Sequence, residues 1–177
     1  MIQRNKMRKT VMTLLFCTSL FALGESTNTL EANFVQTIVD DKNATITYEG
    51  VMLAKRPYMA LWHYSKPVDK SVYINKNTIT IVEPELEQAI VKKLDNTVDI
   101  LAIITSARKE SKGHYTAFYH EKEYHIKMDN KRIESIHYND AFDNRVTITF
   151  TKQHINQKIA DIRFKADIPE DFDVIRD

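Results

Sequence analysis

Cysteine and glycine are scarce in this chain, whose 177 residues include one cysteine and three glycines. The single cysteine is Cys17, which lies within the run from Val11 to Leu23 that carries no charge. Loops that cradle phosphate groups need several closely spaced glycines, and so does the tight turn that presents a catalytic serine in many hydrolases. The composition therefore argues against both kinds of site.

The first ten residues hold four basic side chains and no acidic one. Together with the short apolar run and the small residues Ala22 and Gly24, they predict a secretory signal peptide over residues 1–24, cleaved after Gly24. The run is too short to span a membrane comfortably, since that takes about 20 residues. Cleavage would remove Cys17, so we expect a single mature domain, residues 25–177, without disulfides, cysteine nucleophiles or cysteine-ligated zinc.

Acidic side chains predominate once the leader is removed. The precursor has a net charge of +1 from 25 basic and 24 acidic residues, and four of the bases lie in residues 1–24. The mature domain would keep 21 basic and 24 acidic residues, a net charge of −3. A nucleic-acid partner is therefore not expected, because such proteins need a basic surface.

Apolar and polar residues alternate along most of the remaining chain, which is the period of a half-buried strand. Proline and polar turn residues separate the alternating runs, including a turn at Asn75–Asn77. Strands spaced this evenly predict one antiparallel sheet curled toward a barrel. About ten strands are expected, over residues 45–52, 59–65, 71–74, 78–82, 87–94, 114–119, 123–128, 131–138, 145–151 and 158–164.

Two segments break the alternation. Residues 96–109 are apolar nearly all round at helical spacing, which predicts a central helix buried on more than one side. Asn96 or Thr97 is the candidate cap, with Asp99 in the first turn. A short N-terminal helix is expected over residues 27–38. With so few helices, either the sheet closes tightly on itself or a hollow remains for an apolar guest.

Motifs for catalysis or metal binding are weak throughout. His120 to His125 resembles the zinc motif H-E-x-x-H, but the second histidine is one place too far along and the segment reads as strand and turn. The acidic run Glu83–Glu87 is better explained as a solvated turn. We therefore expect no catalytic residues, no metal site, no cofactor and no enzymatic activity.

Arg56 is the polar residue that stands out, since it ends a strand just before Pro57. One interpretation is an ordinary exposed arginine at a turn. The other is a guanidinium that points across the mouth of a cavity, where its five donors need oxygen partners on whatever covers that mouth. The residues alone leave both interpretations open.

Several stretches resemble the LolA family, the periplasmic carriers of bacterial outer-membrane lipoproteins. The resemblance covers residues 30–177 in order and spacing, and its motifs together are fairly specific. It is carried by Leu30–Gln36, by Arg56–Pro67 with its Trp62, by Pro84–Ala89, and near the end by Ile168–Pro169 and Phe172–Ile175.

The resemblance implies a mainly β fold of about ten to eleven antiparallel strands in an unclosed barrel, with a helical lid over an apolar cavity. It implies a monomeric periplasmic carrier that binds the acyl chains of lipoproteins. An inner-membrane lipoprotein-releasing transporter would load it, and an outer-membrane lipoprotein acceptor, or a different receiving partner, would unload it. Arg56 would be the latch that holds the lid to the barrel.

Strand parity then predicts which side chains line the cavity, because alternate residues share one face. The candidates are Ile46, Tyr48, Met52, Trp62 and Tyr64 from the strands, with Leu101 and Ile104 from the central helix. Two alternatives of the same fold are a carrier of another lipid, such as a glycolipid or fatty acid, and an outer-membrane acceptor. The acceptor needs a lipid-attachment cysteine, and Phe16 in front of Cys17 disfavours one.

Overall fold

The computed structural model describes residues 27–94, 99–119 and 121–176, so the predicted signal peptide lies outside the described residues. These residues form one twelve-stranded sheet with a single short helix, α1 (Ile100–Ser106), and two 3₁₀ turns, η1 (Pro84–Leu86) and η2 (Asp161–Phe164). The strands are β1 (Thr29–Val39), β2 (Thr45–Lys55), β3 (Met59–Lys66), β4 (Lys70–Asn75), β5 (Thr78–Glu83), β6 (Gln88–Lys93), β7 (Arg108–Ser111), β8 (His114–Tyr119), β9 (Lys122–Asp129), β10 (Arg132–Asn139), β11 (Arg145–Ile155) and β12 (Asp173–Arg176).

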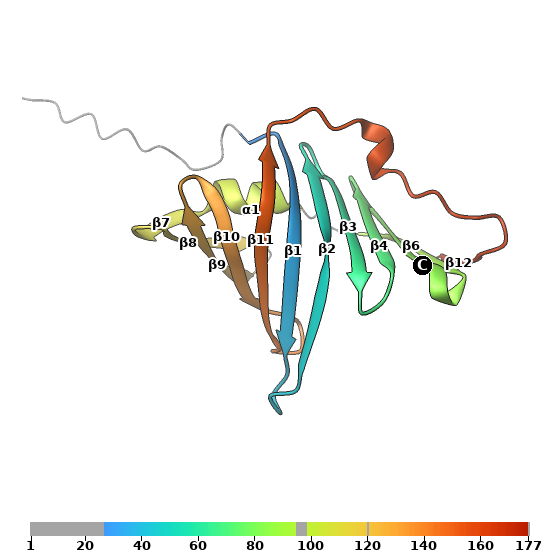
Figure 1. Ribbon diagram of the computed structural model, residues 1–177, viewed down its shortest axis with the longest axis horizontal. Helices are drawn as coiled ribbons and strands as arrows, with labels where there is room; N and C mark the ends of the chain where they lie inside the picture. Colours follow the sequence, from blue (N-terminus) through green and yellow to red (C-terminus); the bar gives the residue numbers. More distant parts are fainter. Residues whose placement is uncertain (1–26, 95–98, 120, 177) are drawn as a thin grey trace, which may run out of the picture.

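The sheet is open, as the resemblance implies. Its order is β12-β6-β5-β4-β3-β2-β1-β11-β10-β9-β8-β7, so β12 and β7 lie at opposite edges and do not pair (Figure 1). Every neighbouring pair is antiparallel except β12 with β6, which is parallel. The long strand β1 pairs along its length with both β2 and β11, and it joins the two halves of the chain at the centre of the sheet.

Nine of the ten predicted strands are confirmed, with ends that differ by at most four residues. The short turn between Asn75 and Thr78 is also confirmed, with Lys76 at a positive φ of 56°. The predicted helix over residues 96–109 is shorter than expected, because α1 ends at Ser106 and residues 108–111 form the edge strand β7. Residues 95–98 lie outside the described part of the chain.

Two predictions of secondary structure are wrong. Residues 27–38 form most of the central strand β1 rather than a helix, because the side chains at 30, 32, 34 and 36 are buried in strict alternation. Residues 158–164 form no strand; they cross a face of the sheet, and only Ile159 and Phe164 turn their side chains inward.

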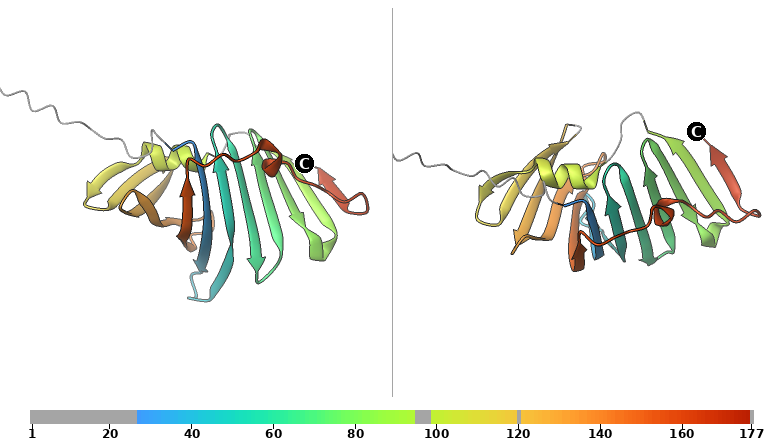
Figure 2. Two further views of the ribbon diagram at one scale, coloured as in Figure 1. Left: turned by 45° about the horizontal axis from the view of Figure 1, so that its top comes forward. Right: turned by 90° about the horizontal axis from the view of Figure 1, so that it is seen from above.

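The inner face of the sheet carries the main core. Leu30, Phe34 and Met52 from the central strands pack there with Ile136 and Phe150 from β10 and β11. Helix α1 lies over this face and contributes Leu101, Ile103 and Ile104 to the same cluster, all nearly fully buried. The C-terminal segment packs on the other face, against Leu53, and Figure 2 shows α1 across β8 to β10 and the C-terminal segment across the strands of the other half.

The outer face around β2 to β4 is covered by residues 156–172, here called the C-terminal strap, which leaves β11 and runs to β12 (Figure 2). Its Ile159 and Phe164 pack against Leu53 of β2 and the neighbouring Leu61 of β3. Lys55 Nζ also donates to the carbonyl of Ile159, at 2.8 Å, and pairs with Asp161. The strap thus fastens the last strand to the far edge of the sheet.

Candidate functional site

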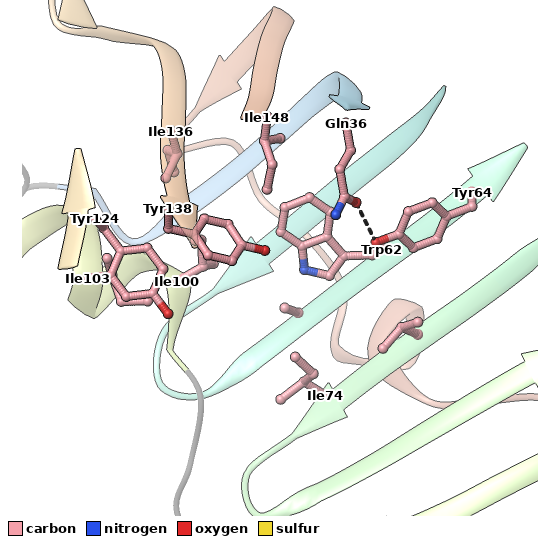
Figure 3. Close-up of a pocket in the computed structure, with 12 residues that line it drawn as sticks. Gln36, Trp62, Tyr64, Ile74, Ile100, Ile103, Tyr124, Ile136, Tyr138 and Ile148 are labelled. Atoms are coloured by element: carbon pink, nitrogen blue, oxygen red, sulfur yellow. Dashed lines mark hydrogen bonds between the residues drawn. The ribbon is translucent and has the colours of Figure 1, made fainter. Parts of the chain in front are cut away.

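A cavity of about 260 Å³ lies between α1 and the inner face of the sheet (Figure 3). It is smaller than most ligand pockets, which hold about 300–1,000 Å³. None of its lining residues is charged. They are Gln36, Ala60, Trp62, Tyr64, Val72, Ile74, Ile100, Ile103, Tyr124, Ile136, Tyr138 and Ile148.

Aromatic rings form one wall. Phe34 of β1 meets Trp62 and Tyr64 of β3 edge to face, with ring centroids 5.0 and 5.1 Å apart, and Tyr48 meets Tyr64 at 5.6 Å. Such edge-on arrangements are the favoured ones for aromatic rings. The rings therefore contact one another and form one continuous aromatic surface.

Gly50 makes this wall possible. It sits in β2 directly between Phe34 and Tyr64 in the strand register. A Cβ atom at Gly50 would lie 2.0 Å from the carbonyl oxygen of His63 and 2.9 Å from the Phe34 ring. The lack of a side chain in β2 thus lets the rings on either side meet over the backbone.

The opposite wall comes from β9, β10 and α1. Tyr124 and Tyr138 pack at 5.1 Å between ring centroids, and Ile100 and Ile103 of α1 lie beside them (Figure 3). Asp99 starts α1, since its carboxylate accepts a hydrogen bond from the backbone nitrogen of Ala102 at 3.0 Å. This cap is the usual device for satisfying the first free N–H groups of a helix.

Several polar groups are set into these walls. The Tyr64 hydroxyl donates to Gln36 Oε1 at 3.0 Å, and Gln36 is only 9% exposed. Burial, reinforced by neighbouring tyrosines, raises the pKa of both Tyr64 and Tyr138 to about 12. The cavity therefore strongly disfavours negative charge. At its rim Lys70 Nζ lies 5.0 Å from the centre of the Tyr64 ring and 5.8 Å from that of Tyr48.

Arg56 reaches α1 from the end of β2. Its Nη2 donates to Thr105 Oγ1 at 2.7 Å and to the carbonyl of Leu101 at 3.4 Å. Its Nε is buried without a hydrogen-bond partner among the described residues. A buried donor without a partner costs about 1–3 kcal/mol, so this contact stabilises the position of α1 only partly.

The predicted lining residues fall in different places. Trp62 and Tyr64 line the cavity, and Tyr48 packs against Tyr64. Met52, Leu101 and Ile104 lie on the same face but are buried in the core around the cavity and do not line it. Ile46 is the second residue of β2, at the end of the strand away from Arg56, and is 43% exposed. The structure therefore brings six of the seven into one region and leaves Ile46 outside it.

Sequence reasoning missed the contributions of β1, β9, β10 and β11. The predicted helix over residues 27–38 includes Gln36, and the sequence gives the strands bearing Tyr124, Tyr138 and Ile148 no place in the sheet. Their alternation was visible in the sequence, yet nothing in it indicates that β11 pairs with β1. On α1, Ile100 and Ile103 face the cavity in place of Leu101 and Ile104.

Known proteins match this arrangement in sequence. Residues 25–167 match the family described as "Outer membrane lipoprotein carrier protein LolA". The chain belongs to the LolA family. Two relatives named outer-membrane lipoprotein carrier protein are similar over most of their length. The one from Campylobacter jejuni is 40% identical over 96% of this chain and 100% of its own, and the one from Wolinella succinogenes is 36% identical over 85% and 88%.

Solved structures support the LolA fold. A LolA superfamily protein from Nitrosomonas europaea matches with a TM-score of 0.50 at 9% identity, covering 81% of this chain and 93% of its own. An uncharacterized conserved protein from Thermus thermophilus matches with a TM-score of 0.54 at 12% identity, covering 87% and 93%. At these identities the likeness concerns the fold alone.

Two further features bear on the site. In residues 27–94, 99–119 and 121–176 no helix has the length and apolar character needed to cross a bilayer. Nor does that part of the chain gather three or more histidine, cysteine, aspartate or glutamate side chains into a possible metal site. His125 lies in β9, and His120, the other histidine of the H-E-x-x-H-like stretch, lies outside the described residues.

Proposed function

We propose that this protein is a periplasmic carrier that binds the acyl chains of lipoproteins released from the inner membrane and delivers them to the outer membrane. The observation that carries the proposal is an uncharged, largely apolar cavity beneath a short helix in a LolA-family chain. The curated relatives named outer-membrane lipoprotein carrier protein support it, since the Campylobacter jejuni protein matches along its whole length.

The energetics of the cargo explain why such a cavity is needed. Burial of hydrocarbon is worth ~0.8 kcal/mol per CH₂ group, so exposing a chain of roughly 16 carbons to water costs on the order of 10 kcal/mol. A carrier without covalent chemistry can offset this cost by offering aromatic and aliphatic walls. The cavity is small for such a chain, so loading requires α1 to move away from the sheet.

Arg56 is proposed as the latch for that movement. Its bonds to Thr105 and to the Leu101 carbonyl favour the closed, empty state, while its unpartnered Nε limits how strongly they do so. Opening would break these bonds and offset part of the gain from chain burial. The carrier would then bind cargo firmly enough to shield it and weakly enough to release it.

The partners in this proposal are an inner-membrane lipoprotein-releasing transporter and an outer-membrane acceptor, with the carrier acting as a monomer. The direct test mixes the purified protein with inner-membrane vesicles that hold an acylated lipoprotein and the transporter. We expect a soluble complex to appear only when the carrier and the transporter are both present. Copurification of a glycolipid or free fatty acid, without lipoprotein, would instead favour a carrier of another lipid.

The latch has its own test. Arg56→Leu should load cargo but release it more slowly than the wild type, because the closed empty state loses its polar support. The measurement is the rate of lipoprotein transfer from the loaded carrier to outer-membrane vesicles. Arg132→Leu, at an exposed position of β10, is the matched control. Equal transfer rates for the wild type and Arg56→Leu would rule out the latch.

A further inference from the structure

The polar groups of the cavity need a partner that a bare hydrocarbon chain does not provide. Tyr64 already donates its hydroxyl proton to Gln36. By contrast, the hydroxyls of Tyr124 and Tyr138 and the indole N–H of Trp62 have no hydrogen-bond partner among the described residues, although all three side chains line the cavity. Covering such donors with methylene groups alone would cost free energy for each one.

The donors are placed across the cavity from one another. Tyr138 projects from β10, and its hydroxyl points toward the indole of Trp62 on β3 (Figure 3). Tyr124 packs beside Tyr138, with ring centroids 5.1 Å apart and the ring planes tilted by 41°. An indole N–H only donates, so a ligand group that engages Trp62 must be an acceptor.

The charge of the site narrows the class of acceptor. No charged side chain lines the cavity, and Lys70 lies only at its rim, over the Tyr64 ring. Burial raises the pKa of Tyr64 and Tyr138 to about 12, which shows how poorly the interior accommodates an anion. A neutral carbonyl therefore fits better than the carboxylate of a free fatty acid.

We propose that the hydroxyl of Tyr138 and the indole N–H of Trp62 form a subsite for the ester carbonyls that join two acyl chains to a glyceryl group. This inference rests on the proposed carrier function and adds the chemistry of the linkage that the cavity recognises. Tyr124 lies beside the subsite and can take the second ester. The hydrocarbon chains then lie against Ile74, Ile100 and Ile103, and the polar end of the lipid faces the rim near Lys70.

The test compares two ligands that differ only in those carbonyls. A short cysteinyl peptide carries either a dipalmitoyl glyceryl group, with two esters, or the dihexadecyl glyceryl analogue, with two ethers. Binding to the purified protein is measured by displacement of a fluorescent acyl probe. We expect the wild type to bind the diester about fivefold more tightly than the diether, as one or two modest hydrogen bonds allow.

The variants assign that preference to named atoms. Tyr138→Phe should lose most of the preference for the diester and keep its affinity for the diether, because it removes one hydroxyl and little else. Tyr73→Phe, a tyrosine on the outer face of β4, is the matched control and should behave as the wild type. Palmitate should bind more weakly than the diester to all three proteins.

The outcomes separate this inference from the function beneath it. If neither lipopeptide displaces the probe, the carrier proposal fails and the subsite fails with it. If both bind the wild type equally, or if Tyr138→Phe keeps the full preference, the carrier proposal stands and the ester subsite is overturned. Tighter binding of palmitate than of the diester would also overturn it.

Discussion

The two halves of the sheet are covered on opposite faces. Around β1, β8, β10 and β11 the inner face lies under α1, whereas around β2 to β4 the outer face lies under the C-terminal strap. On the strap side of the sheet, the inner face of β4, β5, β6 and β12 presents a row of partly exposed apolar residues. The row has one residue per strand: Val72, Ile81, Ile90 and Ile175. The cavity lies where the part of the inner face under α1 meets the part that α1 leaves uncovered, because β4 contributes Val72 and Ile74 to its lining.

This difference shows that one sheet can use one face for a stabilising core and the other face for a binding cavity. The strap completes a small core that has no access to the cavity, so it can be tight and permanent. Helix α1 completes the main core and also roofs the cavity, so the proposed carrier function needs its contacts to break. The row from Val72 to Ile175 continues the apolar surface of the inner face beyond the roof.

The largest expected effect breaks the strap side of the comparison. Phe164 is 1% exposed and fills the strap core, so Phe164→Ala should lower the free energy of unfolding by about 4 kcal/mol. Urea unfolding measures this loss. Ile162→Ala changes a 67% exposed side chain in the same turn and should cost almost nothing. Below the unfolding midpoint, binding of an acyl probe should match the wild type; a selective loss of binding would contradict the separation.

A second prediction concerns Gly50 of β2, where Phe34 of β1 and Tyr64 of β3 meet; this contact is called the seam between the two halves. Gly50→Ala should lower the free energy of unfolding by about 2–3 kcal/mol, because the new Cβ meets the backbone of β3 and the Phe34 ring. It should also weaken probe binding, since Phe34 supports Trp62 and Tyr64. Thr45→Ala, at an exposed position of the same strand, is the control. A stable variant with unchanged binding would show that the seam is plastic.

A third effect is confined to alkaline solution and belongs to the cavity side alone. In the folded protein burial raises the pKa of Tyr64 and Tyr138 to about 12, against an ordinary tyrosine pKa of about 10. The unfolded chain therefore loses these protons first as the pH rises, so stability is fully present below about pH 10 and declines toward pH 12. Urea midpoints across that range measure the decline. Tyr138→Phe should make it shallower, and an unchanged slope would contradict the assignment.

Much of the sheet could be predicted from the period of two, but β1 could not. Leu30, Phe34 and Ile38 lie four residues apart, which suits a helix, and they also lie on one face of a strand. The helical interpretation overlooked Ala32 and Gln36 between them, which are small or polar yet buried. Only the pairing of β1 with β2 and β11 decides between the two periods.

The site was predictable only where its residues are close in sequence. Trp62 and Tyr64 follow from parity within β3, while Tyr124 and Tyr138 reach the cavity through the pairing of β1 with β11, more than one hundred residues away. On α1, neighbouring residues differ by about 100° around the axis. An error of one residue in the predicted facing therefore selects Leu101 and Ile104, whereas Ile100 and Ile103 are the pair that faces the cavity.

The ends of the sheet have a consequence for crowded conditions. Strand β7 is four residues long, and all of its residues are exposed: Arg108, Lys109, Glu110 and Ser111. Strand β12 is equally short and is anchored by the strap. Short, charged margins oppose the addition of a further strand from another molecule. The short, charged edge strands thus keep this open sheet from polymerising edge to edge, although its cargo is apolar.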